Sequence, residues 1–176
     1  MWCDSVDGRT PVESIVLDEI VPRIDQRFRT RAERSGRAFA GFSMGGYGAL
    51  RLGFAHHDTV ATVVSLGGGP LQRELVATPR ADEARRQQVL QNVFGGDMAA
   101  FVARSPWQLA ERHAAAKGES LRILQAIGTA DETLPANRDF HAHLQKLGIA
   151  HDYVELADTA HEPLRAAIAR LTTDMI

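Results

Sequence analysis

The chain has 176 residues, of which 44% are hydrophobic and 24% charged, and this composition fits one globular domain with a single sizeable core. A net charge of -2 gives no basic surface for nucleic acid or for an acidic membrane. One cysteine, Cys3, excludes an intramolecular disulfide framework, and no stretch is long and apolar enough to cross a bilayer. The sequence as given shows no signal peptide, so we expect a cytoplasmic protein in which Cys3 is a partly buried small hydrophobe.

Apolar side chains at helical spacing predict an amphipathic helix over residues 11–28, kinked or restarted at Pro22, because proline lacks the N–H that a helix interior needs. The β-branched run at 60–66 predicts a buried strand. Ser105-Pro106 is a favourable helix start, with serine as N-cap and proline in the first turn. The other predicted helices span residues 44–56, 82–94, 105–117, 134–147 and 163–175, and the other predicted strands span residues 37–42, 121–127 and 150–156.

Strands that alternate with helices pair in parallel through right-handed crossovers. The predicted fold class is therefore α/β, with an open, mostly parallel sheet and helices on both faces. We expect one domain over residues 1–176. Within it, residues 70–104 are weakly patterned, which is typical of an insertion at the carboxyl edge of the sheet. We interpret this segment as a lid or substrate wall, with a plain packing element as the alternative.

Gly41-Phe42-Ser43-Met44-Gly45 matches the pattern G-x-S-x-G between a predicted strand and a predicted helix. A nucleophile elbow holds its serine in a strained turn, and small neighbours such as Gly41, Gly45 and Gly46 leave room for the backbone. The N–H of Met44, at the helix start, would face a developing oxyanion. The sequence therefore predicts Ser43 as a nucleophile, with an ordinary glycine-rich turn as the alternative.

A serine nucleophile needs a base, and the base needs an orienting acid, in the chain order Ser, Asp or Glu, His. Asp131 follows the strand predicted at 121–127 and His161 follows the strand at 150–156, so both lie at the edge where open α/β sheets bind ligands. Glu132 is the rival for the acid, and capping of the next helix is the alternative role of Asp131. The other histidines lie within or at the ends of predicted elements: His56, His57, His113, His141, His143 and His151.

No metal or phosphate site is expected. Side chains two positions apart, as in His141-x-His143, do not share one helical face, and no cysteine or carboxylate cluster complements them. The glycine run 67–69 lacks the Lys-Ser/Thr of a P-loop, and we interpret it as a turn beside the nucleophile. We therefore predict that the protein uses no metal and no cofactor.

Residues 41–50, which read Gly-Phe-Ser-Met-Gly-Gly-Tyr-Gly-Ala-Leu, resemble the elbow of the putative esterase (esterase D) branch of the α/β hydrolases. The similarity continues in the acidic helix 19–25, in the Gly-Thr-Ala-Asp stretch 128–131, in the helix that carries Asn137, Phe140 and Leu144, and in the histidine loop. This resemblance implies a triad of Ser43, Asp131 and His161 that cleaves small or short-acyl carboxylic esters through an acyl-enzyme. Residues 2–5 are similar to an active-site loop of that family, and we expect Asp4, Phe42 and Gly67 to bind the substrate.

One departure from the family pattern concerns the start of the chain. Family members carry further strands before the acidic helix, including the loop that supplies a second oxyanion N–H. The resemblance therefore implies a shortened sheet with one oxyanion donor missing and with an exposed edge, which proteins usually cover or pair. We expect a homodimer in which the partner covers this edge. Two alternatives remain open: an acyltransferase with the same triad, and a non-catalytic hydrolase-like module used for binding or assembly.

Overall fold

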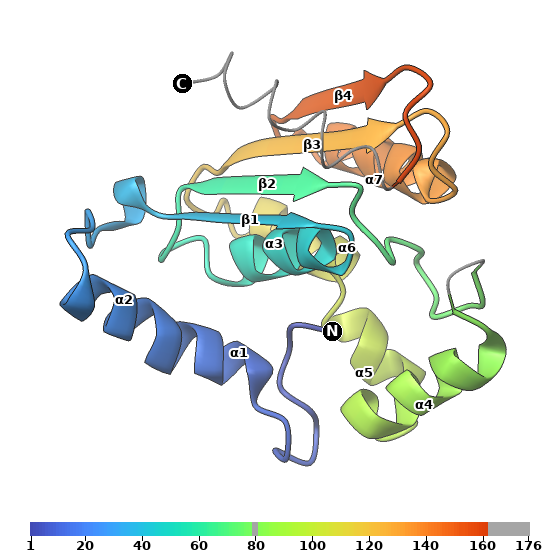
Figure 1. Ribbon diagram of the computed structural model, residues 1–176, viewed down its shortest axis with the longest axis horizontal. Helices are drawn as coiled ribbons and strands as arrows, with labels where there is room; N and C mark the ends of the chain where they lie inside the picture. Colours follow the sequence, from blue (N-terminus) through green and yellow to red (C-terminus); the bar gives the residue numbers. More distant parts are fainter. Residues whose placement is uncertain (79–80, 162–176) are drawn as a thin grey trace.

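Parallel strands form the sheet of the computed structural model, which describes residues 1–78 and 81–161. Among these residues the strand order is β1-β2-β3-β4, and every neighbouring pair is parallel (Figure 1). The register aligns the carboxyl ends, because Phe42 pairs with Leu66, Leu66 with Ala126, and Ala126 with Val154. The loops that follow the strands therefore meet at one edge. The strands are β1 (Ala38–Phe42), β2 (Thr62–Leu66), β3 (Arg122–Gly128) and β4 (Asp152–Leu156).

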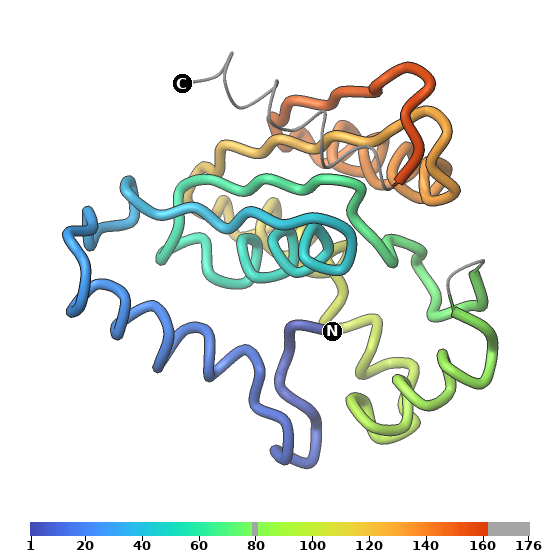
Figure 2. Tube along the Cα trace, viewed as in Figure 1, coloured from blue at the N-terminus to red at the C-terminus, as the bar shows by residue number. Residues whose placement is uncertain are grey.

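The first helical segment is continuous through Pro22, so the restart predicted there as one possibility is wrong. Figure 2 shows this segment as one uninterrupted coil. It consists of α1 (Val12–Ser14), a π-helical stretch (Ile15–Ile20) and α2 (Val21–Arg27). Wider turns, in which the N–H of Val21 donates to the carbonyl of Val16, precede the proline and let the chain pass its missing N–H. A short 3₁₀ turn, Arg34–Gly36, then leads into β1.

Glu13 ties this segment to the rest of the fold. Its carboxylate contacts Arg51 Nη2 at 2.7 Å and His56 Nε2 at 2.6 Å, and both partners belong to the helix after β1 or to its end. Much of the apolar stripe that predicted the helix faces outward. The exposed side chains on this stripe are Ile15, Ile20, Ile24 and Phe28.

The segment predicted as a lid contains α4 (Glu83–Phe94) and α5 (Met98–Ala103), which lie beside the N-terminus (Figure 1). Aspartates cap both helices: Asp82 accepts from the N–H of Arg85, and Asp97 from that of Ala99. Their apolar faces form a small second core with the first residues of the chain. Its buried members are Cys3, Leu75, Leu90, Phe94 and Phe101.

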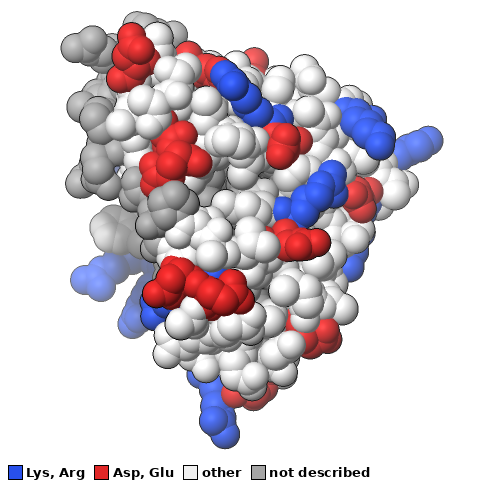
Figure 3. All heavy atoms as spheres, turned by 90° about the vertical axis from the view of Figure 1, so that its right-hand side faces the viewer, with Lys and Arg blue, Asp and Glu red and all other residues white. Residues whose placement is uncertain are grey.

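Figure 3 views the molecule from the side toward which the strands point in Figure 1. Acidic and basic side chains alternate over the described part of this face, with wide uncharged areas between them. The view therefore shows no large area of a single charge. Among the described residues, no helix combines the length and the apolar character that a membrane crossing requires.

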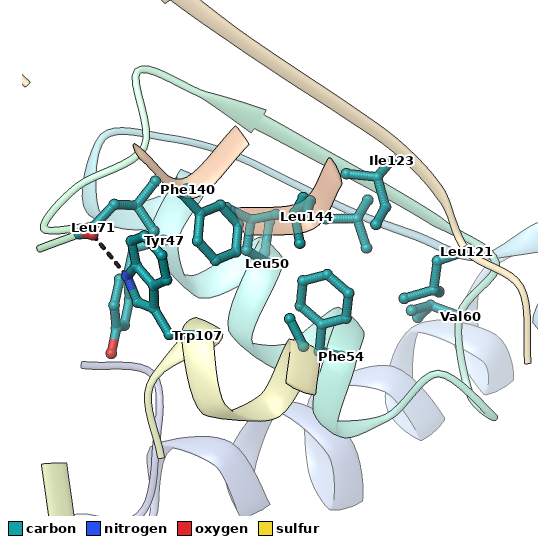
Figure 4. Close-up of a cluster of buried hydrophobic side chains, with 13 residues drawn as sticks. Tyr47, Leu50, Phe54, Val60, Leu71, Trp107, Leu121, Ile123, Phe140 and Leu144 are labelled. Carbon is teal, nitrogen blue, oxygen red and sulfur yellow. Dashed lines mark hydrogen bonds between the residues drawn. The ribbon is translucent and has the colours of Figure 1, made fainter. Parts of the chain in front are cut away.

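The main core lies between the sheet and a layer made of α3 (Met44–Ala55), α6 (Pro106–Ala115) and α7 (Leu134–Lys146). Figure 4 shows side chains of these three helices converging with Val60, Leu121 and Ile123. The indole N–H of Trp107 donates to the carbonyl of Leu71 at 2.8 Å, which fixes the chain just beyond β2. On the opposite face, Leu66 and Ala126 form a smaller apolar cluster. The structure is thus the open parallel α/β sheet that the sequence predicts, and the helix expected at 163–175 lies outside the described residues.

Candidate functional site

Ser43 occupies the sharp turn between β1 and α3 with φ 57° and ψ -121°, a conformation that side-chain-bearing residues rarely adopt. Three backbone hydrogen bonds hold this strained turn. The Ser43 N–H donates to the carbonyl of Leu66 at 2.8 Å, and the Ser43 carbonyl accepts from the N–H groups of Tyr47 and Gly69, each at 3.1 Å. The turn therefore fixes Ser43 at the carboxyl edge of the sheet, beside the end of β2.

The two outer glycines of the motif, Gly41 and Gly45, differ in the space that surrounds them. A Cβ atom on Gly41 would overlap the carbonyl group of Gly45, so the turn cannot close with a larger residue at Gly41. A Cβ atom on Gly45 would meet no heavy atom within 4 Å. Of the two outer glycines of G-x-S-x-G, only Gly41 is thus required for space, and the prediction that Gly45 is also needed for space is wrong.

Asp131 and His161 are brought together from the loops after β3 and β4. Asp131 Oδ2 and His161 Nδ1 are 2.6 Å apart, and both side chains are almost completely buried. The other carboxylate oxygen, Oδ1, accepts from the N–H and from the hydroxyl of Thr133, both at 2.8 Å. The carboxylate is therefore held on both sides, and it presents one oxygen to the imidazole. Glu132, the rival acid, instead lines a separate cavity.

The second ring nitrogen of His161 points away from this bond. Nε2 is buried and has no hydrogen-bond partner among the residues described. The ring of Phe42 packs against the imidazole with 4.6 Å between centroids and so limits its rotation. A histidine that is held at Nδ1 and unpartnered at Nε2 is in the arrangement that a general base requires.

A cavity of about 240 Å³ joins these groups, because Ser43, Met44 and His161 all line it. Met44 stands at the first position of α3, where the N–H has no partner within the helix. Most of the remaining lining comes from the segment 70–104. The wall residues from that segment are Pro70, Gln72, Thr78, Ala81, Arg85, Arg86 and Val89, and Met1, Gly69 and Thr133 complete the lining.

None of the three residues that we expected to bind substrate is part of the lining of this cavity. The Asp4 carboxylate accepts from the N–H of Ser14 at 3.1 Å and from its hydroxyl at 2.6 Å, so it fixes the first helical segment. Phe42 contacts the His161 ring, as described above. Gly67 has φ 54°, and its N–H donates to the carbonyl of Ala126 at 2.8 Å, which turns the chain away from β2.

Sequence reasoning missed the polar wall of the cavity, and Arg86 above all. One signal was available. Arg86, Leu90 and Phe94 follow each other at intervals of four and are the buried residues of α4, so a cation occupies the buried face of an amphipathic helix. Elsewhere, Cys3 is buried, as expected, and burial raises the pKa of its thiol. No group of three potential metal ligands occurs in the described ranges 1–78 and 81–161.

Comparison with known proteins places the chain in one family. The family model described as "Putative esterase" matches residues 4–166. Esterase Rv1288 of Mycobacterium tuberculosis H37Rv is 28% identical over an alignment of 163 positions, and the match covers 82% of this chain and 35% of that protein. The chain thus spans about a third of the length of the curated relative.

Solved structures share the fold at lower identity. The fluorophosphonate-binding serine hydrolase FphF of Staphylococcus aureus superimposes with a TM-score of 0.79 at 20% identity, over 99% of this chain and 66% of that chain. The S-formylglutathione hydrolase FrmB of the same organism gives 0.76 at 21% identity, over 96% and 64%. These likenesses confirm the predicted fold class.

Proposed function

Because the chain belongs to the putative esterase family, we propose that it is a serine carboxylic-ester hydrolase with Ser43 as nucleophile, His161 as base and Asp131 as orienting acid. One observation carries the assignment of residues. His161, which Asp131 contacts at 2.6 Å, lines the same cavity as Ser43 in its strained turn. The esterase and serine-hydrolase names of the relatives support the same chemistry.

Each residue has a defined part in the reaction. Asp131 holds His161 at Nδ1, so that Nε2 takes the proton of Ser43 Oγ as this oxygen bonds to the carbonyl carbon of the ester. The N–H of Met44 stabilises the oxyanion. The imidazolium then gives its proton to the departing alcohol, which leaves an acyl-enzyme on Ser43. A water molecule, deprotonated by His161, attacks the acyl carbon and releases the acid and the serine.

The cavity favours small substrates. Its volume of about 240 Å³ is below the roughly 300–1,000 Å³ of sites for drug-sized ligands. Residues 70–104 supply most of the cavity lining other than Ser43, Met44 and His161, which supports the interpretation of this segment as a substrate wall. We expect short-acyl esters to be cleaved faster than long-chain ones.

The test is covalent labelling. The protein is incubated with a fluorophosphonate, and the adduct is located by mass spectrometry in the wild type, in Ser43→Ala and in Ser35→Ala, a control at an exposed serine. We expect an adduct on Ser43 in the wild type and in the control, together with hydrolysis of short-chain nitrophenyl esters. No adduct on Ser43 and no hydrolysis would favour the non-catalytic module. Acyl transfer to a competing alcohol in preference to water would assign an acyltransferase.

We also propose that a second copy of the chain covers the free edge of β1. Among the described residues β1 pairs with β2 alone, and Ile20, Ile24 and Phe39 line an apolar hollow of about 230 Å³ next to this strand. Burial of apolar side chains in this hollow would stabilise a dimer. Solution scattering is expected to give a dimer for the wild type and for Val102→Asp, and a monomer for Ile24→Asp. A monodisperse wild-type monomer contradicts the proposal.

A further inference from the structure

Arg86 is a buried cation in the wall of the cavity that also holds Ser43 and His161. Only 7% of the residue is exposed, whereas the other charged residues of α4, Glu83 and Arg85, are exposed, and Arg85 lines the cavity from a solvent-exposed position. Its Nη2 donates to Thr78 Oγ1 at 2.9 Å, and Thr78 lines the same cavity. Its Nε is buried without a hydrogen-bond partner in the described part of the chain.

The position lacks the counter-charge that such a residue normally has. Burial lowers the pKa of the Arg86 guanidinium, and no carboxylate among the described residues opposes this effect. Arg51 offers the internal comparison, because it is similarly buried and its Nε is also unpartnered among the described residues. Arg51, however, is paired with Glu13 at 2.7 Å. Glu13 thus compensates the charge of Arg51, whereas within the described ranges the charge of Arg86 lies in a cavity wall without an acid beside it.

A buried charge without a partner is costly, and buried charges in proteins are normally paired, so a bound anion would compensate the charge of Arg86. Guanidinium is planar and presents several N–H donors, which suits the two oxygens of a carboxylate. The hydrogen bond to Thr78 leaves further donors free and holds the side chain at the cavity surface. The occupant that best completes this wall is therefore an anion within the substrate.

We propose that Arg86 binds a carboxylate of the substrate, so that the preferred substrates are small esters that carry a second, ionised acid group. The proposal rests on the proposed function, since it concerns the substrate of the same site. The carboxylate can belong to the acyl part, as in the half-ester of a dicarboxylic acid, or to the alcohol part, as in an acylated hydroxy acid. Both place one negative charge within a few bonds of the ester carbonyl.

Two matched pairs of esters test the proposal and separate the two sources. On the acyl side, 4-nitrophenyl hemisuccinate is compared with 4-nitrophenyl butyrate. On the alcohol side, 4-acetoxybenzoate is compared with its methyl ester. The wild type is expected to show a higher kcat/KM for the anionic member of at least one pair. Arg86→Gln is expected to lower kcat/KM for that anionic ester about 10- to 100-fold, mainly through KM, and to leave the neutral ester within about threefold.

Control variants separate the charge from the fold. Arg86→Lys keeps the positive charge and is expected to restore part of the preference. Arg112→Gln removes an exposed arginine of α6 and is expected to change neither ester. Activity of Arg86→Gln on the neutral ester shows that this variant folds. If Arg86→Gln does not fold, Arg86→Lys is used in its place. It is then expected to show only part of the wild-type preference for the anionic ester, and an unchanged preference would contradict the assignment of Arg86.

The outcomes distinguish this inference from the proposed function. If the fluorophosphonate labels Ser43 but the wild type prefers the neutral member of both pairs, or if Arg86→Gln affects both members of each pair equally, the assignment of Arg86 is overturned while the hydrolase assignment stands. If Ser43 is not labelled and no ester is cleaved, both are overturned.

Discussion

The carboxylate of Asp131 and the imidazole of His161 meet at 2.6 Å although 30 positions separate them in the chain. The parallel register of β3 and β4 produces this contact, since Gly128 pairs with Leu156 and the two loops leave the sheet together. The N–H of Ala130 donates to the carbonyl of Thr159 at 3.1 Å and ties the loops to each other. The geometry of the pair is thus a property of the sheet as well as of the two side chains.

Asp131→Asn tests the orienting role of the carboxylate. An amide retains the shape but offers Nδ1 a donor or a neutral acceptor, so the imidazole no longer holds the tautomer with a free Nε2 lone pair. We expect kcat to fall on the order of 10⁴-fold, with a change in KM below about threefold. Steady-state kinetics on a short-chain nitrophenyl ester measures both values.

Thr133→Val is the matched control, because it removes the hydroxyl that donates to Asp131 Oδ1 and keeps the N–H that donates to the same atom. A loss of about tenfold or less is expected for this variant, since one neutral-donor hydrogen bond is removed. Equal losses in Asp131→Asn and Thr133→Val would contradict the assignment.

The geometry of the turn at Ser43 predicts that the variant Ser43→Gly is more stable than Ser43→Ala. Both lack the hydroxyl, but only glycine adopts φ 57° and ψ -121° without steric cost. The strain released, about 1–3 kcal/mol, exceeds the roughly 0.5–1 kcal/mol by which glycine gains entropy in the unfolded chain. Urea unfolding is therefore expected to give a higher midpoint for Ser43→Gly than for Ser43→Ala. The reverse order would mean that Ser43 is unstrained.

Gly41→Ala and Gly45→Ala form a second matched pair within one motif. The new methyl group collides with the backbone of Gly45 in the first variant and meets no atom within 4 Å in the second. Gly41→Ala should destabilise the fold by about 1–3 kcal/mol and abolish activity, because the turn that carries Ser43 must shift. Gly45→Ala should keep its activity and gain up to about 1 kcal/mol, since it lies in α3. Thermal melting measures the stability of the two variants, and ester hydrolysis measures their activity. Equal effects of the two changes would contradict the steric difference between Gly41 and Gly45.

The lowered pKa of Glu13 makes the stability of the fold depend on pH in the acid range. Burial alone would raise the pKa of Glu13, but hydrogen bonds from His56 and Arg51 outweigh burial and lower it to about 2, from 4.5 in the unfolded chain. A depressed pKa stabilises the fold fully above pH 4.5, and this contribution is lost as the pH falls toward 2. The contribution is on the order of 3 kcal/mol.

Denaturant unfolding at several pH values between 5 and about 2 checks this prediction. The free energy of unfolding of the wild type should fall more steeply than that of Glu13→Gln, which cannot be protonated. Asp82→Asn, at an exposed helix cap, serves as the control and should follow the wild type closely. Parallel curves for the wild type and Glu13→Gln would show that the ion pairs of Glu13 contribute nothing.

The parts of the site that the sequence could predict are those set by chain order. Ser43, Asp131 and His161 each follow a strand with a readable hydrophobic pattern, and parallel strands bring such loops to one edge. The placement of Arg86 depends on how α4 folds back over the cavity, which no local pattern encodes. The same holds for Asp4, whose hydrogen bonds to Ser14 depend on a turn of the chain rather than on its residue type. At Pro22, propensity predicted a kink or a restart, and a π-helical stretch carries the helix through the proline without a restart.

Strand β4 has a further consequence for the behaviour of the protein on heating. Among the described residues this strand pairs only with β3, and its last residues lead directly to His161. A shift of β4 by one residue would move the loop by roughly 3.3 Å, which is more than the hydrogen bond to Asp131 can tolerate. Edge elements open at lower free energy than a packed core does. The temperature at which hydrolysis stops should therefore lie below the temperature at which the main core melts, so one short strand sets the thermal limit of activity.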